Sequence, residues 1–195
     1  DGADFSTFHV IDTNESEVVC EFKGKVPPDQ FAVVLMEASK RYNNAIICPE
    51  SNTYGYAVLM KLKELKCQNI YFEKEKDRIS ALYNDGPIGK GGFSTQGPSR
   101  SKILTKLEEV IRNKQVKTYS SRLYEEMKTF VWKGSKPQAM RGKHDDLVMS
   151  LAIGIWLYDT SSFHSKSSAD LNKAMLSGFS TSSSSFQGSV GSSFG

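Results

Sequence analysis

The chain has 195 residues, of which 38% are hydrophobic and 24% are charged, and its formal net charge is +3. That length is enough for one domain with a sizeable core and an additional tail. Because the net charge is small, the protein is not basic all round, and a nucleic acid would have to bind a local basic patch. Three cysteines without C-x-x-C spacing argue against a disulfide framework or a structural zinc site, so we expect a reducing, intracellular setting. No apolar run approaches the length of a membrane span, so no membrane partner is expected.

Segments with the patterns of strands and helices alternate as far as Thr160. Two β-rich runs, 5–12 and 17–24, flank a turn-prone stretch and predict a hairpin. A helix is expected next over 27–43, because two prolines and an aspartate mark its start. The later segments predict, in order, a strand (45–50), a helix (54–65), a strand (69–73), a Gly- and Pro-rich loop (83–99), a helix (100–115), a strand (116–119), a helix from 122 that leads to a strand at 130–133, and a last helix within 142–158. This alternation is typical of an α/β layered domain with a mixed sheet.

The sequence changes character after Thr160. Residues 161–195 are dominated by Ser and Gly, with scattered Phe and little charge. Such a segment cannot bury enough apolar surface to offset the entropy lost on ordering. We therefore predict a folded domain over residues 1–160 and a flexible tail over 161–195.

The segment GKHDDLVMSLAIGIW, residues 142–156, places two adjacent aspartates directly before an apolar run. The apolar residues recur at helical spacing and fill most other positions, which predicts a helix buried on nearly every side. His144, Asp145 and Asp146 could form its polar first turn, where a carboxylate caps free N–H groups. One aspartate is enough for that task, so the pair also indicates an acidic site at the edge of the core.

Acidic residues stand at three predicted element ends. Asp4 precedes the first strand, Glu50 ends the strand 45–50, and Asp145 and Asp146 begin the last helix. Strand ends and helix starts meet at one edge of an open α/β sheet, where sites are built. Carboxylates gathered there repel one another unless a cation neutralises them, and hard oxygen ligands suit Mg²⁺ or Mn²⁺. Each acid alone is explained as a surface residue; their combination predicts a divalent-metal site.

Three motifs, GADFSTFHVID, IICPESNTYG and HDDLVMSLAIGIW, together resemble the nuclease domain of the large terminases of tailed bacteriophages, the DNA-packaging motor proteins. The resemblance runs from Asp1 to about Tyr158, with the motifs in the right order. It implies an RNase H-like fold, in which a mixed β-sheet is flanked by helices. It also implies a Mg²⁺- or Mn²⁺-dependent endonuclease that cuts concatemeric double-stranded DNA with low sequence specificity during genome packaging, by two-metal phosphodiester hydrolysis.

The resemblance implies roles for individual acids. Glu50 matches the family's strand-end metal ligand and Asp146 matches its late aspartate, with Asp145 beside it as a ligand or an orienting residue. Asp4 matches an acid in the turn after the strand that carries the family's first catalytic aspartate. That strand and the family's ATPase module lie upstream, so we expect the chain to be truncated at its N-terminus, unless Asp4 serves as a substitute ligand. His144 is expected either to contact a carboxylate or a DNA phosphate, or to cap the helix.

Basic residues cluster in two stretches, the first of which contains no acidic residue and leads into the Asp pair. The expected DNA contacts are Lys133, Lys136, Arg141 and Lys143 in the first stretch, and Lys90 and Arg100 in the second. Such contacts position DNA through its phosphates without reading sequence. For Arg100 the alternative is the solvated face of an amphipathic helix. The segment GPIGKGG lacks the P-loop pattern, so no nucleotide is expected.

The resemblance also implies partners. These are double-stranded DNA, the phage portal and the small terminase subunit, in the cytoplasm of the host cell. Two alternatives stay open. Another RNase H-like nuclease, such as a junction resolvase or an exonuclease, would use similar acids, whereas a non-catalytic module would dock on DNA or the portal through its basic face and tail.

Overall fold

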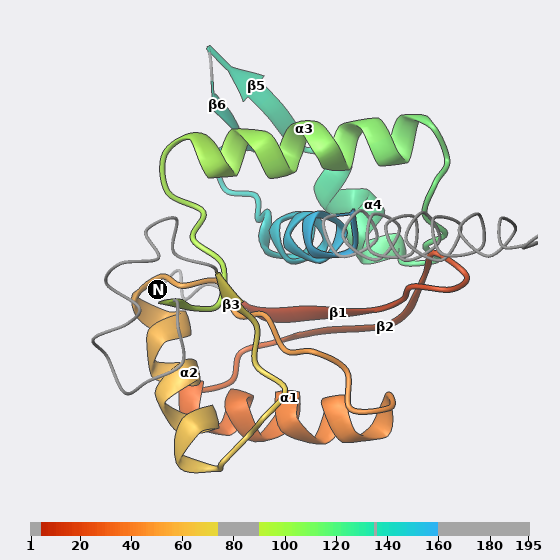
Figure 1. Ribbon diagram of the computed structural model, residues 1–195. Coiled ribbons are helices and arrows are strands. Elements are labelled where there is room, and N and C mark those ends of the chain that lie inside the picture. Colours follow the sequence, from red (N-terminus) through yellow and green to blue (C-terminus); the bar gives the residue numbers. More distant parts are fainter. Residues whose placement is uncertain (1–4, 74–89, 135, 160–195) are drawn as a thin grey trace, which may run out of the picture. The chain divides into compact units, whose positions relative to one another are not determined.

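The computed structural model describes residues 5–73, 90–134 and 136–159, so Asp4 and the tail predicted over 161–195 lie outside the described residues (Figure 1). The elements are β1 (Ser6–Asp12), β2 (Glu17–Gly24), α1 (Pro28–Arg41), α2 (Thr53–Glu64), β3 (Phe72–Glu73), β4 (Lys90–Gly91), α3 (Pro98–Arg112), α4 (Ser121–Lys128), β5 (Phe130–Lys133) and β6 (Lys136–Ala139). A last helix covers residues 146–159. Nearly all of this belongs to one compact unit, Asp1–Leu157. No helix among these elements is long and apolar enough to cross a membrane.

The predicted hairpin is confirmed by the pairing of β1 with β2. The two strands are antiparallel, with Ser6 opposite Gly24 at one end and Asp12 opposite Glu17 at the other. At the turn, Oδ1 of Asp12 accepts a hydrogen bond of 2.8 Å from the N–H of Asn14. An aspartate that bonds the backbone two residues on closes a tight turn, so the short TNES stretch is enough to reverse the chain.

The start of α2 is fixed by a close approach of backbone to backbone. The side chain of Asn52 accepts a hydrogen bond of 2.7 Å from the N–H of Gly55 and so caps the helix. A Cβ atom at position 55 would lie 1.7 Å from the carbonyl oxygen of Glu50. Only glycine fits there. The IICPESNTYG stretch therefore folds back tightly on itself, and this places Glu50 against the first turn of α2.

The α/β class is confirmed, but the strands pair less extensively than the sequence indicates. Among the described residues there are three two-stranded antiparallel sheets, β1–β2, β3–β4 and β5–β6. The predicted strands 45–50 and 116–119 form isolated parallel bridges instead, such as Glu50 with Phe93 and Glu17 with Lys117. Pro49 has no N–H to donate, so a regular ladder cannot run through that position. The pairing is mixed in direction, as predicted, without one continuous ladder.

The last helix is buried, as its sequence predicts. Its buried residues are Leu147, Val148, Met149, Leu151, Ala152, Ile153 and Ile155. They form one hydrophobic cluster with residues of α3 and with Leu123 of α4. A second cluster joins α1 and α2, around Phe31 and Leu62, and includes Ile47 and Ile70 of the bridged segments. The element that begins with the two aspartates is therefore the centre of the larger core.

A buried histidine links β1 to this helix. The side chain of His9 is 1% exposed; its Nδ1 lies 2.8 Å from Oγ of Ser150 and its Nε2 lies 3.3 Å from a carboxylate oxygen of Glu21. Burial lowers the pKa of His9 below its usual 6.5, although the nearby Glu21 and Glu126 carboxylates act in the opposite direction and Arg122 adds to the lowering. Burial alone would raise the pKa of Glu21, but hydrogen bonds from Ser120 and Arg122 outweigh it and the pKa is lowered. His9 is therefore neutral in the folded protein near neutral pH.

We expect the protein to lose stability as the pH falls from 7.5 to 5.5. The unfolded chain binds a proton at His9 near pH 6.5, whereas the folded chain binds it only at a lower pH. The free energy of unfolding should therefore fall below that pH, by at most about 1.4 kcal/mol per pH unit for one proton. Urea unfolding at both pH values measures the change. In a His9→Gln variant the decline should be smaller, and an equal decline would assign it to other groups.

Candidate acidic site and basic hairpin

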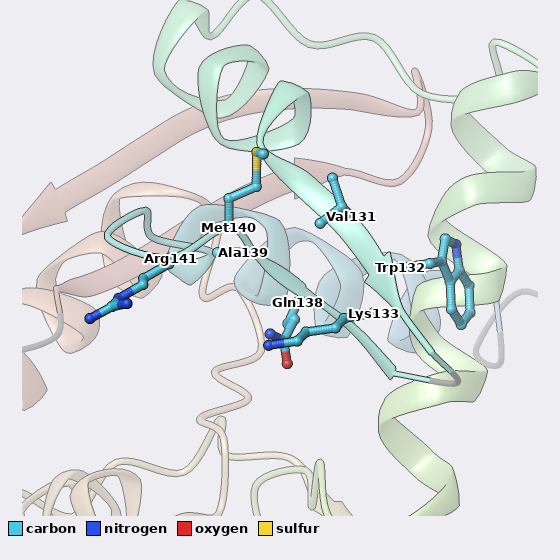
Figure 2. A pocket seen from close by; sticks show the side chains of 7 residues that line it. All are labelled: Val131, Trp132, Lys133, Gln138, Ala139, Met140 and Arg141. Carbon is cyan, nitrogen blue, oxygen red and sulfur yellow. The ribbon is translucent and has the colours of Figure 1, made fainter.

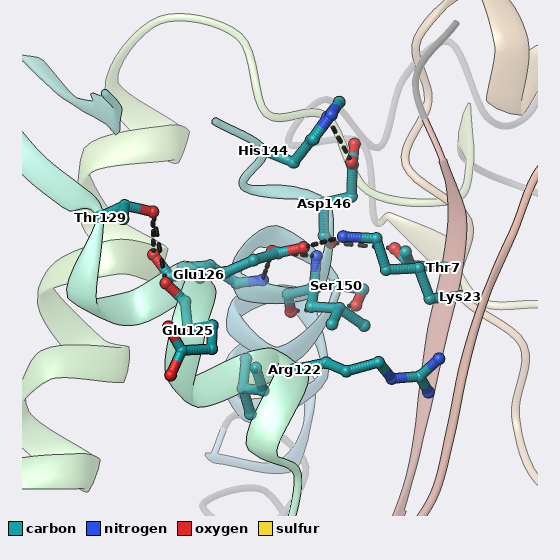
Figure 3. Close-up of polar contacts among 12 residues, drawn as sticks. Thr7, Lys23, Arg122, Glu125, Glu126, Thr129, His144, Asp146 and Ser150 are labelled. Atoms are coloured by element: carbon teal, nitrogen blue, oxygen red, sulfur yellow. Dashed lines mark hydrogen bonds and ion pairs between the residues drawn. The ribbon is translucent and has the colours of Figure 1, made fainter. Parts of the chain in front are cut away.

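The first turn of the last helix is capped by a residue from another element. Oε2 of Glu126, on α4, accepts hydrogen bonds from the N–H groups of Leu147 (2.8 Å) and Val148 (3.3 Å), as Figure 3 shows. These N–H groups have no partner within the helix, because the first turn lies before the regular bonding pattern begins. The sequence suggested that the HDD stretch could cap this helix. In the structure, Glu126 caps the N–H groups of Leu147 and Val148.

Glu126 is a buried acid with a partly buried basic partner. It is 6% exposed, and Nζ of Lys23 on β2 lies 2.5 Å from its Oε1 (Figure 3). Lys23 also stands over the ring of Phe5, 4.5 Å from its centroid. Nothing in the sequence pattern marked Glu126, since a lone glutamate on a short amphipathic helix is usually solvated. Its capping role depends on a contact over 21 residues of separation, which no local signal reveals.

Asp145 and Arg100, two residues predicted for the site, are brought together. Nη2 of Arg100, in the first turn of α3, lies 2.8 Å from Oδ2 of Asp145, and both side chains are about one-third exposed. The sequence suggested a DNA contact for Arg100 and a metal contact for Asp145. In the structure the two side chains form an ion pair. Neither of them therefore extends only into solvent.

Asp146 is held from two sides. Its backbone carbonyl accepts a hydrogen bond of 2.9 Å from Oγ1 of Thr7 on β1 (Figure 3). Its carboxylate atom Oδ2 is inaccessible to solvent and lies 3.5 Å from Nδ1 of His144. The ring of His144 in turn meets Phe5 edge-on, with centroids 5.0 Å apart. His144 therefore stands beside the Asp146 carboxylate, as one of its two predicted roles requires.

Glu50 lies where the segment before α2 meets the segment after β4. The N–H of Phe93 donates to the carbonyl of Pro49, and the N–H of Ser51 donates to the carbonyl of Phe93, both at 2.8 Å. These two bonds form the single parallel bridge that holds Glu50. Its carboxylate accepts a hydrogen bond from the hydroxyl of Thr95. Glu50 is half-buried, so its carboxylate is partly shielded from water.

The start of β1 connects the two acid-bearing segments. Oγ of Ser6 lies 2.9 Å from the hydroxyl of Tyr54, in the first turn of α2, and the next residue, Thr7, bonds to Asp146. The helix starts that follow Glu50 and Asp145 therefore both contact the beginning of β1. Within the part of the chain that the structure describes, no group of three His, Cys, Asp or Glu side chains lies close enough to hold a metal ion.

The basic stretch before the Asp pair forms a short hairpin. Lys133 pairs with Lys136 at its tip, beside Gly134, whose φ of 64° suits a tight turn. An open groove of about 460 Å³ runs along the hairpin; it is lined by Val131, Trp132, Lys133, Gln138, Ala139, Met140 and Arg141 (Figure 2). Trp132 is 58% exposed.

The predicted basic residues of this stretch, Lys133, Lys136, Arg141 and Lys143, are all exposed, and none forms an ion pair with another described residue. The structure thus leaves these cations available at the surface. Lys90 begins β4, but its side chain lies outside the described residues. The sheet partner of β5 was missed in the sequence, although the KGSK stretch carries a glycine turn signal.

Comparison with known proteins finds similarity among solved structures. No protein-family model matches the sequence, and no curated protein sequence matches it. Among solved structures, the chain is similar to the large terminase nuclease from the thermophilic phage G20c, with 20% sequence identity over 78% of this chain and 75% of that one, and a TM-score of 0.57. The likeness spans most of both chains and confirms the resemblance to a terminase nuclease that the three sequence motifs indicated. The chain shares the fold of a phage large terminase nuclease.

Proposed function

We propose that this chain is the nuclease domain of a phage large terminase, a metal-dependent endonuclease that cuts concatemeric double-stranded DNA with low sequence specificity during packaging. The observation that carries the proposal is the fold that this chain shares with the phage G20c nuclease. In this chain, the HDD segment leads into a buried helix. Its partners would be double-stranded DNA, the portal and the small terminase subunit, in the host cytoplasm. A resolvase or an exonuclease of the same fold would instead require a DNA junction or a free end.

We propose that Glu50 and Asp146 supply ligands to a hard divalent cation. Glu50 and Asp146 offer carboxylate oxygens, the ligands that Mg²⁺ and Mn²⁺ prefer. Both carboxylates are partly or largely withdrawn from solvent, and a cation there would offset the cost of keeping negative charge away from water. Such a cation, or a pair of them, supplies activation of water and stabilisation of the leaving 3′ oxygen. Asp145 would join the ligands through Oδ1, since its ion pair with Arg100 engages Oδ2, or by giving up that pair, and Asp4 stays a further candidate.

The protein's own groups would hold and orient the reacting parts. Thr7 fixes the backbone of Asp146, and His144, beside the same carboxylate, would orient it or donate to the scissile phosphate. Arg100 would contact a phosphate once released from Asp145. The exposed basic residues of the β5–β6 hairpin and of the turn after it would bind the DNA backbone on its way to the acids, which requires no reading of sequence.

In the full-length protein, Asp146→Asn is expected to lower the rate of plasmid cleavage in Mn²⁺ by more than about 100-fold, beyond the 10–100-fold typical of residues outside the ligand set. The melting temperature without metal should hold or rise slightly, because one of several like charges is removed. The rise of melting temperature with Mn²⁺ should shrink. Asp159→Asn, an exposed aspartate at the far end of the same helix, is the matched control. A fully active Asp146→Asn protein would remove this residue from the metal site, and cleavage only of junctions or free ends would favour the alternative nucleases.

Replacing Lys136 and Arg141 with alanine is expected to weaken DNA binding equally for unrelated duplexes. Each phosphate contact contributes about −0.9 to the slope of log affinity against log salt, so the slope should become shallower by up to about two units. Titration of duplex DNA at several salt concentrations measures it. The variant with Lys40 and Arg41 replaced, at the exposed end of α1, loses the same charge elsewhere. Equal changes in both variants would show that only net charge matters.

A further inference from the structure

We propose that Glu126 is a positioning residue for the acidic site, acting through the helix start that carries Asp145 and Asp146. This inference rests on the proposed function, because it assigns Glu126 to the same site. The carboxylate of Glu126 makes two kinds of contact, one with each oxygen. One oxygen accepts from the N–H groups of Leu147 and Val148, and the other accepts from Lys23.

The arrangement gives the Glu126 carboxylate polar partners within the core. A buried carboxylate is costly unless it is paired and hydrogen-bonded. Lys23 supplies the opposite charge at 2.5 Å, and the helix N-terminus supplies two N–H donors together with the positive end of the helix dipole. Both oxygens of Glu126 thus have partners from different elements, one from β2 and one from the last helix. The carboxylate connects β2, α4 and the last helix at one point.

The capped N–H groups follow Asp146 directly in the chain. A helix end without such partners frays in its first turn, and here that turn begins at Asp146. Thr7 holds the carbonyl of Asp146 from β1, while Glu126 holds the next two N–H groups from α4. The backbone that carries both aspartates is therefore held on its two sides, by Thr7 and by Glu126.

A second ion pair between β2 and α4 offers a comparison with the pair of Lys23 and Glu126. Glu21 on β2 pairs with Arg122 on α4 at 2.7 Å, one turn of helix from the pair of Lys23 with Glu126. The two ion pairs link the same strand to the same helix, with the charges exchanged. Only the pair that contains Glu126 reaches the start of the last helix; the other reaches His9.

The test compares the parent with Glu126→Gln, Glu126→Met and Arg122→Gln at a temperature where all four proteins are folded. We expect Glu126→Met, which has no acceptor, to weaken Mn²⁺ binding by about 10–100-fold, the range seen when a supporting residue around a metal site is lost. Glu126→Gln keeps an acceptor oxygen and should rescue part of that loss. Arg122→Gln should lower the melting temperature yet leave Mn²⁺ affinity within about twofold of the parent. Amide hydrogen exchange at Leu147 and Val148 should speed up in the same order as affinity falls.

The results distinguish a failure of the positioning role of Glu126 from a failure of the proposed metal-dependent function. If the parent binds Mn²⁺ and Glu126→Met binds it equally well, Glu126 only holds the fold and the positioning role is wrong. The role is also wrong if Arg122→Gln weakens Mn²⁺ binding as much as Glu126→Met does. If the parent itself binds no Mn²⁺, the proposed metal-dependent function fails, whatever the exchange rates at Leu147 and Val148 show. Should Glu126→Met not fold, Glu126→Gln against Arg122→Gln makes the same comparison.

Discussion

The structure depends on burying one helix on almost all sides. A helix in that position cannot leave its first N–H groups to water, so a protein group must accept from them. Here the group is the carboxylate of Glu126, brought by α4 and neutralised by Lys23 of β2. The core, the cap and the ion pair are thus parts of one arrangement. The hydrophobic cluster sets where the helix lies, and the buried charge sets where it begins.

This arrangement explains why acidic residues can follow one another at the helix start. Three carboxylates, those of Glu126, Asp145 and Asp146, belong to the same region. Lys23 lies beside Glu126, Arg100 beside Asp145 and His144 beside Asp146. The cations Lys23 and Arg100 therefore offset repulsion at two of the three acids. The pair of Arg100 with Asp145 is partly exposed, and its contribution to stability is modest. The pair matters more for the candidate site, because Arg100 is the partner of Asp145 when no ligand is bound.

Local patterns predicted the elements but not the contacts between them. The hairpin of β1 and β2, the proline start of α1 and the apolar periodicity of the last helix all follow from interactions within a few residues. The single bridge at Glu50 differed from the predicted strand because Pro49 interrupts the donors. The acids Glu50, Asp145 and Asp146 could be selected from the sequence, since they stand at element ends. Glu126, Thr7 and Thr95 could not, because each acts across a long separation along the chain.

The bridge at Glu50 also means that the two principal acids stand on supports of very different local stability. Asp146 opens a helix in the centre of the core, whose amides are released only when much of the domain opens. Glu50 stands on a segment without a regular ladder, which is held by two backbone hydrogen bonds to the segment after β4 and, at Ile47, by two more to residues 69 and 71. A segment with so few backbone hydrogen bonds opens at a lower free energy than a core helix does. One side of the candidate site is therefore rigid and the other compliant. Small adjustments in the separation of these acids would come from the Glu50 side, while the helix keeps Asp146 in place.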